Sequence, residues 1–150
     1  MQALIDSLEG TWIGSGTGSY PSIEDFSYQE TITLTRLPKK PVLSYSQRTL
    51  SSEGEPLHSE SGFFRFEASA VELVIAQPTG IVEAHRGTIV GNRIDLRQVA
   101  IGRTPSAIPV EEVRRVIEVG SDTITYDLEV ATGDYPLTLH LRATLHRQGP

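Results

Sequence analysis

Apolar and polar residues alternate with a period of two over most of the chain. Between Phe26 and Leu34, every second residue is large and mostly apolar, and the residues in between are Ser, Gln or Thr. Such a period is typical of strands whose two faces meet different surroundings. The first eight residues differ, because Leu4, Ile5 and Leu8 fall on one side of a helix. The pattern therefore predicts a short N-terminal helix followed by strands.

Short segments rich in Gly, Pro, Asn and Asp separate the alternating runs. Gly91-Asn92 fits a two-residue hairpin turn, and the Pro-containing segment 37–41 fits a turn outside any ladder. Because short hairpins join antiparallel neighbours, we expect an antiparallel sheet. The strands are predicted at residues 11–16, 26–34, 42–50, 57–66, 71–77, 81–90, 93–100, 112–119, 123–131 and 137–147.

About ten short strands at this spacing predict one all-β domain over residues 1–150. An up-and-down arrangement can close into a single antiparallel barrel whose interior holds one small ligand. A sandwich, the alternative, would fill its interior with side chains. Residues 102–109, which contain two Pro and show no period, form either a loop over a barrel mouth or a simple edge crossing.

Charge and composition narrow the possible partners. Nineteen acidic and thirteen basic residues give a formal charge of -6, which disfavours nucleic acid and anionic membrane surfaces as partners. The absence of Cys excludes thiolate metal sites, thiol catalysis and disulfides. The chain starts without a secretory signal pattern and has no apolar run long enough to cross a bilayer, so we expect a cytoplasmic protein.

Candidate chemistry is sparse. The four imidazoles belong to His58, His85, His140 and His146, and none forms a paired metal motif. His140 and His146 are six residues apart, about 20 Å along an extended strand, so they cannot share a metal ion. No G-x-S-x-G nucleophile elbow is present. Taken one at a time, each His is more often a surface or hydrogen-bonded residue than a ligand.

A run of glycines after the first helix is more informative. Gly10, Gly14, Gly16 and Gly18 alternate with other residues, but no Lys and no helix follow to cradle a phosphate. Glycines in a strand instead indicate a sharp bend at a barrel corner or the close approach of a flat ligand to the main chain.

Gly10-Thr11-Trp12 after a short helix resembles the G-x-W of the lipocalin and fatty-acid-binding superfamily. The full run, GTWIGSGTGSYPSI at residues 10–23, more specifically resembles the G-x-W-x-G-x-G-x-G-x-Y-P motif of the nitrobindin family. Residues 26–30 (FSYQE), 44–49 (SYSQRT), 56–63 (PLHSESGF) and 76–80 (AQPTG) are similar to that family's strands. The resemblance extends over residues 10–147.

This resemblance implies a ten-stranded barrel that holds one haem b through a single axial His. His140 matches the family's H-L-x-A-x-L pattern, as HLRATL, and is the implied iron ligand. Ser22 stands where many relatives have Thr beside the haem edge, and Glu111 stands where several have Lys near the pocket mouth. The remaining cofactor-site residues that the resemblance suggests are Gly10, Trp12, Gly14 and Gly16. In the superfamily, the Trp closes the barrel base against a basic side chain of the last strand, here Arg142 or Arg147.

The family's ferric haem is associated with isomerisation of peroxynitrite to nitrate and with nitric oxide binding, so the resemblance implies a haem-dependent peroxynitrite isomerase. A five-coordinate haem leaves its other face open to such a small molecule. His58 could line that distal side, although an exposed position is favoured. The alternative is a fatty-acid-binding type of barrel that carries a small apolar ligand without catalysis.

The last strand presents a conflict. Leu137, Leu139, Leu141, Ala143 and Leu145 share one face, and His140 falls on the other. If the apolar face is inside, His140 points to water. The conflict would disappear if the leucines packed outside the barrel, on the N-terminal helix or on a second copy in a homodimer.

Overall fold

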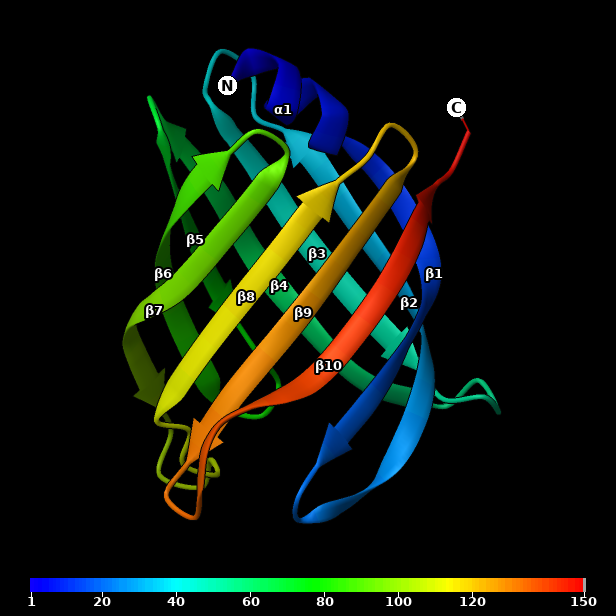
Figure 1. Cartoon of the computed structure of the whole chain (residues 1–150), viewed down its shortest axis with the longest axis vertical. Helices are drawn as coiled ribbons and strands as arrows, with labels where there is room; N and C mark the ends of the chain where they lie inside the picture. The colour runs from blue at the N-terminus through cyan, green and yellow to red at the C-terminus, as the bar shows by residue number, and fades with distance from the viewer. Residues whose placement is uncertain (150) are drawn as a thin grey trace.

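The computed structural model describes residues 1–149 as one short helix and ten strands (Figure 1). The elements are α1 (Gln2–Leu8), β1 (Gly10–Tyr20), β2 (Ile23–Arg36), β3 (Val42–Leu50), β4 (Pro56–Glu67), β5 (Ala70–Ala76), β6 (Ile81–Val90), β7 (Arg93–Arg103), β8 (Glu112–Val119), β9 (Thr123–Thr132) and β10 (Tyr135–Arg147).

The strands form a closed antiparallel barrel. Each strand pairs with its neighbours in sequence, and β1 also pairs with β10, which closes the sheet. The predicted all-β barrel with an N-terminal helix is therefore confirmed, and the sandwich alternative is wrong. Closure removes the exposed edges that an open sheet of this length would present. Among the described residues, no helix is long and apolar enough to cross a membrane.

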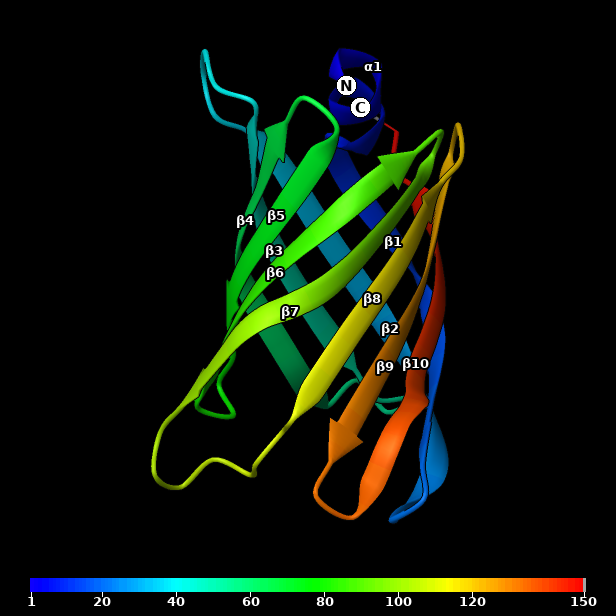
Figure 2. The same cartoon turned by 60° about the vertical axis from the view of Figure 1, so that its left-hand side comes forward.

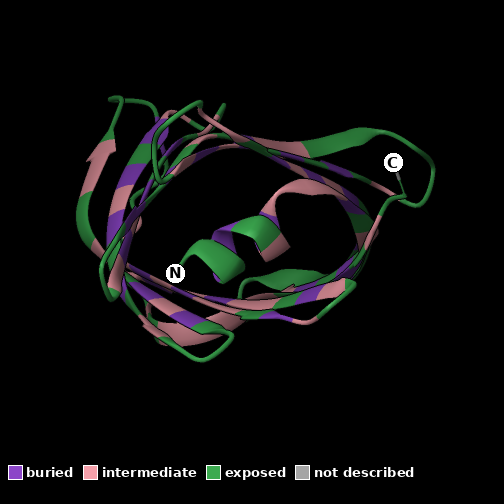
Figure 3. Cartoon of the chain, turned by 90° about the horizontal axis from the view of Figure 1, so that it is seen from above, coloured by how far each residue is buried: buried purple, intermediate pink, exposed green. Residues whose placement is uncertain are grey.

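Helix α1 covers one end of the barrel, inside the ring of strands (Figure 3). Leu4, Ile5 and Leu8 of α1 are buried, as the helical pattern predicts. Fully buried Trp12 donates its indole N–H to the Leu8 carbonyl at 2.9 Å. The guanidinium of Arg147 lies 4.2 Å from the centre of the Trp12 ring. Of the two basic residues considered for this contact, Arg147 makes it.

The opposite end, which we call the mouth, is bordered by the connection between β7 and β8 (Figure 2). Strand β7 continues to Arg103, three residues beyond its predicted end. Ser106, Ile108 and Val110 of the connection line the barrel cavity. Of the two predictions for this segment, the loop over the mouth is confirmed.

Strand β10 contains an irregularity that changes which side chains face inward. Leu139 pairs with Glu129, but Leu141 pairs with Leu128, so one extra residue, His140, is inserted into β10. Ala143 and Leu145 are buried in the barrel, and Leu141 lines its cavity. The expectation of an outward leucine face is therefore wrong for Leu141, Ala143 and Leu145, whereas Leu137 and Leu139 do not line the cavity. The homodimer stays a prediction.

Candidate functional site

A cavity of about 850 Å³ runs along the barrel interior. It extends from Leu8 of α1 to Phe26, Ile108 and His140 at the mouth. Most of its lining is apolar, with a few polar groups. Concave, largely apolar sites of this size are typical of sites for small organic ligands and cofactors.

His140 is brought to this cavity by the bulge in β10. Side chains of a regular strand alternate between its faces, so His140 would point away from the side that Leu141 faces. The extra residue breaks the alternation, and both side chains line the cavity. Bulges commonly redirect a side chain at a functional site. The conflict seen in the sequence is therefore resolved by a local change of register, which places His140 inside together with Leu141, Ala143 and Leu145.

The hydrogen bond of His140 selects one tautomer. Its Nδ1 lies 3.0 Å from the Ser19 carbonyl oxygen, at the end of β1. Because a carbonyl can only accept, Nδ1 carries the proton and Nε2 keeps its lone pair in the neutral ring. Proteins usually orient a metal-binding imidazole by such a hydrogen bond from the ring nitrogen that does not bind the metal.

Two aromatic rings fix the imidazole from the sides. Tyr20 packs edge-on against His140 with ring centres 5.5 Å apart, and Phe26 does so at 6.4 Å. The Tyr20 hydroxyl lies 3.3 Å from the Val130 carbonyl oxygen, which ties β1 to β9 across β10. His140 is thus held by its own backbone, one carbonyl and two rings.

The glycine run makes room for these rings. A Cβ at Gly16 would overlap the Tyr28 ring, and a Cβ at Gly18 would overlap the Phe26 ring. Both glycines are buried and stand opposite these aromatics in the β1–β2 ladder. Gly14 instead allows close approach of the β10 backbone, because its Cβ would overlap the Thr144 carbonyl. The glycines shape the aromatic wall beside His140, a role that the sequence did not reveal.

The other residues suggested for the cofactor site do not gather around His140. Gly10 and Trp12 lie at the α1 end, where the Trp12 indole bonds to Leu8. Ser22 is exposed in the turn after Tyr20, at the mouth. Glu111 is also exposed, and its backbone N–H donates to the Ala131 carbonyl beside the mouth. Ser22 and Glu111 are at the same end of the barrel as His140, but neither lines the cavity.

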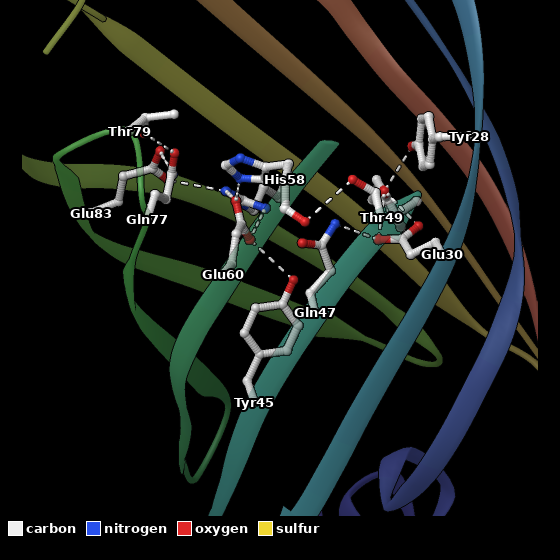
Figure 4. Close-up of polar contacts among 12 residues, drawn as sticks. Tyr28, Glu30, Tyr45, Gln47, Thr49, His58, Glu60, Gln77, Thr79 and Glu83 are labelled. Atoms are coloured by element: carbon white, nitrogen blue, oxygen red, sulfur yellow. Dashed lines mark hydrogen bonds and ion pairs between the residues drawn. The ribbon is translucent and has the colours of Figure 1, made fainter. Parts of the chain in front are cut away.

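The barrel interior also holds charged groups that the alternating pattern does not distinguish from surface residues. Arg115 on β8 crosses the lumen and donates to both carboxylate oxygens of Glu60 on β4, at 2.9 and 3.1 Å. It also contacts Glu83 on β6 at 3.1 Å. Tyr45 donates its hydroxyl to Glu60 at 3.1 Å (Figure 4). The only sequence signal was a charged residue at an inward position of each of three strands.

These neighbours determine the pKa of Glu60. Burial alone would raise it, but the Arg115 guanidinium and the hydrogen bonds from His58 and Arg115 outweigh burial and lower the pKa to about 2. Glu83 is similar, since its hydrogen bond from His85 and the charge of Arg115 lower its pKa against the effect of burial. Both carboxylates are therefore ionised at neutral pH.

Glu30 on β2 has the opposite behaviour. It accepts hydrogen bonds from the Gln47 amide at 2.8 Å and from the Tyr126 hydroxyl at 2.8 Å. The Tyr28 hydroxyl lies 2.9 Å from that of Tyr126 and extends this series of hydrogen bonds toward the mouth. Burial raises the pKa of Glu30 to about 7, although both hydrogen bonds oppose this shift.

The remaining histidines have other environments. His58 is half-buried, lines the cavity and lies 3.5 Å from a Glu60 oxygen. The exposed position favoured for it from the sequence is therefore wrong. His85 is fully buried, with Nε2 2.7 Å from Glu83. His146 is exposed. Among residues 1–149, no three His, Cys, Asp or Glu side chains come together as a site for a bare metal ion.

The residues present do fit a haem. The porphyrin supplies four nitrogen ligands to its iron, so the protein needs to add only one or two. His140 offers one oriented Nε2, and the cavity beside it offers the apolar walls of Phe26, Leu128 and Val130. This donor set suits an iron that brings its own equatorial ligands.

Comparison with known proteins agrees with this geometry. A family model described as the THAP4-like, heme-binding beta-barrel domain matches residues 3–147. The chain is 44% identical over 140 residues to "Peroxynitrite isomerase 1" of Rhodococcus jostii, covering 92% of this chain and 79% of that protein. It is 42% identical to "Peroxynitrite isomerase" of Nocardia farcinica, covering 97% and 89%.

A solved structure has the same architecture. The crystal structure of Rv2717c from M. tuberculosis superposes with a TM-score of 0.90 at 39% identity, covering 99% of this chain and 96% of that one. With a family match over nearly its whole length, this chain belongs to the THAP4-like haem-binding β-barrel family, the nitrobindin family that its glycine run resembles.

Proposed function

We propose that this protein is a peroxynitrite isomerase that uses haem b, with His140 as the single protein ligand of the iron, and that it also binds nitric oxide. The observation that carries the proposal is the bulge in β10, which turns His140 into the cavity with its Nδ1–H held by Ser19. The names of the relatives, peroxynitrite isomerase in each case, support the reaction. The acidic, Cys-free composition supports a cytoplasmic location.

Conversion of peroxynitrite to nitrate is an isomerisation, so no atom is gained or lost and no proton acceptor is needed. When bound, the ferric haem supplies the Lewis acid that no side chain here can offer. The role of the protein's own residues is to bind and orient the cofactor. His140 would hold the iron through Nε2, while Phe26 and Tyr20 keep its ring in place. The apolar walls near the mouth restrict water around the reactants.

The interior charges count against the fatty-acid-binding alternative. A carrier of that kind needs a free cation inside the barrel to receive the carboxylate. Arg115 is instead engaged by two ionised carboxylates, Glu60 and Glu83. A fatty acid head group would have to displace one of them to pair with this guanidinium.

Replacement of the ligand tests the proposal. We expect the wild-type protein to give a Soret band on reconstitution with haem and to accelerate loss of peroxynitrite with formation of nitrate. His140→Ala removes the only imidazole positioned by Ser19, so the band should shift or disappear while the circular dichroism of the barrel is unchanged.

His146→Ala is the matched control, since His146 lies on the same strand but is exposed. It should bind haem and turn over peroxynitrite as the wild type does. An unchanged haem spectrum in His140→Ala would rule out the assigned ligand. A normal spectrum without isomerase activity would rule out the reaction and keep the ligand.

A further inference from the structure

The cavity extends past the polar groups of the lumen toward α1, where its lining becomes apolar. On β2, Ile32 and Leu34 lie on the α1 side of Glu30. On β4, Phe64 lies on the α1 side of Glu60. The same order holds on the other strands that line this end. We call this end the inner chamber, and its lining residues are Leu8, Ile32, Leu34, Phe64, Leu73, Ile117 and Ile124.

Two cross-lumen links separate the inner chamber from the mouth. One joins Arg115 on β8 to Glu60 on β4, and the other joins Tyr126 on β9 to Glu30 on β2. Gln47 lies on β3, between the strands that carry the two carboxylates, and donates to Glu30. Figure 4 shows the groups around Glu30, Gln47 and Glu60 across the barrel interior, with α1 to one side of them. We call these five residues the polar partition.

The far end of the inner chamber is closed by α1. The Trp12 indole holds the Leu8 carbonyl, and the Arg147 guanidinium donates to the carbonyls of Ser7 and Glu9. Three hydrogen bonds from two residues, one on each of the two strands that close the barrel, therefore fix the helix in place. A molecule in the inner chamber is confined between α1 and the polar partition.

We propose that the inner chamber is a second binding site, distinct from the haem site, for a small uncharged apolar molecule of the size of a diatomic gas. The lining residues named above are all apolar. The polar side chains that stand beside them each direct a polar group to a buried carboxylate: Tyr45 to Glu60, Gln47 and Tyr126 to Glu30, and His85 to Glu83. Apolar cavities of this kind stay free of water and take up molecules such as xenon.

The surroundings restrict what can enter. A charged ligand would lose its hydration without gaining a polar partner in the chamber. A long acyl chain would have to cross the polar partition and separate Arg115 from Glu60 or Tyr126 from Glu30. The same cavity nevertheless continues through the partition, which leaves a route for a molecule of a few atoms.

This site does not depend on the proposed reaction, because none of its lining residues contacts His140 in the interactions that orient the ring. Nitric oxide belongs to the class of molecule that the chamber accepts, whereas peroxynitrite, an anion, does not. If the proposed function holds, the chamber stores the neutral gas behind the haem and excludes the anionic substrate.

Xenon pressure on crystals tests the inference. We expect an anomalous difference peak bounded by Leu34, Leu73 and Ile124, in crystals grown both with and without haem. No peak in the chamber, or ordered water filling it, would overturn the proposal. Since xenon uptake requires neither haem nor turnover, failure of the proposed isomerase activity would leave this result unaffected.

Paired substitutions on β5 sharpen the test. Leu73 points inward and Val74 outward, so Leu73→Phe fills the chamber and Val74→Phe adds the same ring to the surface. The peak should be lost in Leu73→Phe and retained in Val74→Phe. If Leu73→Phe does not fold, Ile124→Phe from β9 serves the same purpose. A peak of unchanged height in the folded filled variant would place the xenon elsewhere and contradict the proposal.

Discussion

The two ends of this barrel are built from the same alternating strands, but one end is closed and the cavity opens at the other. At the α1 end, Trp12 and Leu145 are fully buried, and a helix closes the lumen. At the mouth, a bulge turns His140 inward and the connection between β7 and β8 leaves the cavity accessible. Regular alternation fills the α1 end with apolar side chains. A departure from it, with small residues in the neighbouring strand, brings His140 to the cavity at the mouth.

The polar partition lies between these ends and explains how they coexist. Glu60 and Glu83 are compensated by Arg115, so charges can lie deep inside the barrel without unfolding it. Four substitutions or titrations would test the contrast between the ends, beginning with the one expected to change stability most.

Trp12→Ala should lower the free energy of unfolding by about 3–5 kcal/mol, because it leaves a cavity under α1 and removes the ring on which Arg147 packs. Trp12 and Tyr20 are eight residues apart on β1, about 26 Å along an extended strand. The haem spectrum of the folded protein should therefore be unchanged. Urea unfolding and the Soret band measure the two effects, and Val90→Ala, at an exposed position, is the control. A large spectral change would contradict the independence of the two ends.

The stability of the polar partition should depend on pH in two opposite ways. The native pKa of Glu30, about 7, is above its ordinary value of 4.5, so stability falls as pH rises from about 4.5 to 7, by about 3 kcal/mol. The native pKa of Glu60, about 2, is below 4.5, so its contribution is lost as pH falls from 4.5 toward 2.

Urea midpoints measured across this pH range test the assignment. Glu30→Gln should flatten the limb between pH 4.5 and 7 and leave the acid limb unchanged. Exposed Glu24, on the same strand, gives the control Glu24→Gln, which should keep both limbs. An identical pH profile in Glu30→Gln and the wild type would show that another group titrates.

Gly16→Ala should destabilise the mouth half by about 1–3 kcal/mol, because its methyl group must displace the Tyr28 ring or the β10 backbone. The Soret band should also change, since the aromatic wall next to His140 moves. Thr17→Ala, one residue further on and exposed, should do neither. Wild-type stability in Gly16→Ala would mean that the wall has room the structure does not show.

Tyr20→Phe should have the smallest effect. The ring that packs on His140 remains, and only the hydroxyl contacts with Val130 and Thr132 are lost. A loss of about 0.5–1.5 kcal/mol is expected, with an unchanged haem spectrum. Tyr20→Leu, which also removes the ring, should alter the spectrum. Equal spectra in the two variants would show that the ring does not orient His140.

The sequence by itself determined the architecture and pointed to the histidine that the structure turns into the cavity near the mouth. Strong alternation and short turns specify antiparallel strands, and this local information accounts for ten strands in order with the helix before them. The strand ends of β1 and β7 were predicted too short, because Gly and polar residues weaken the pattern while the ladder continues. The family motif indicated His140 without showing how it could face inward.

Only the tertiary structure decided which side chains meet. The inserted residue in β10 is invisible in a regular period, since it is defined by the pairing with β9. The role of Gly16 depends on a ring from β2, and the role of Arg115 depends on carboxylates of β4 and β6. Pattern along a chain reports the face on which a residue lies. Closure of the barrel determines what stands across the lumen, and that information lies in contacts between residues far apart in the sequence.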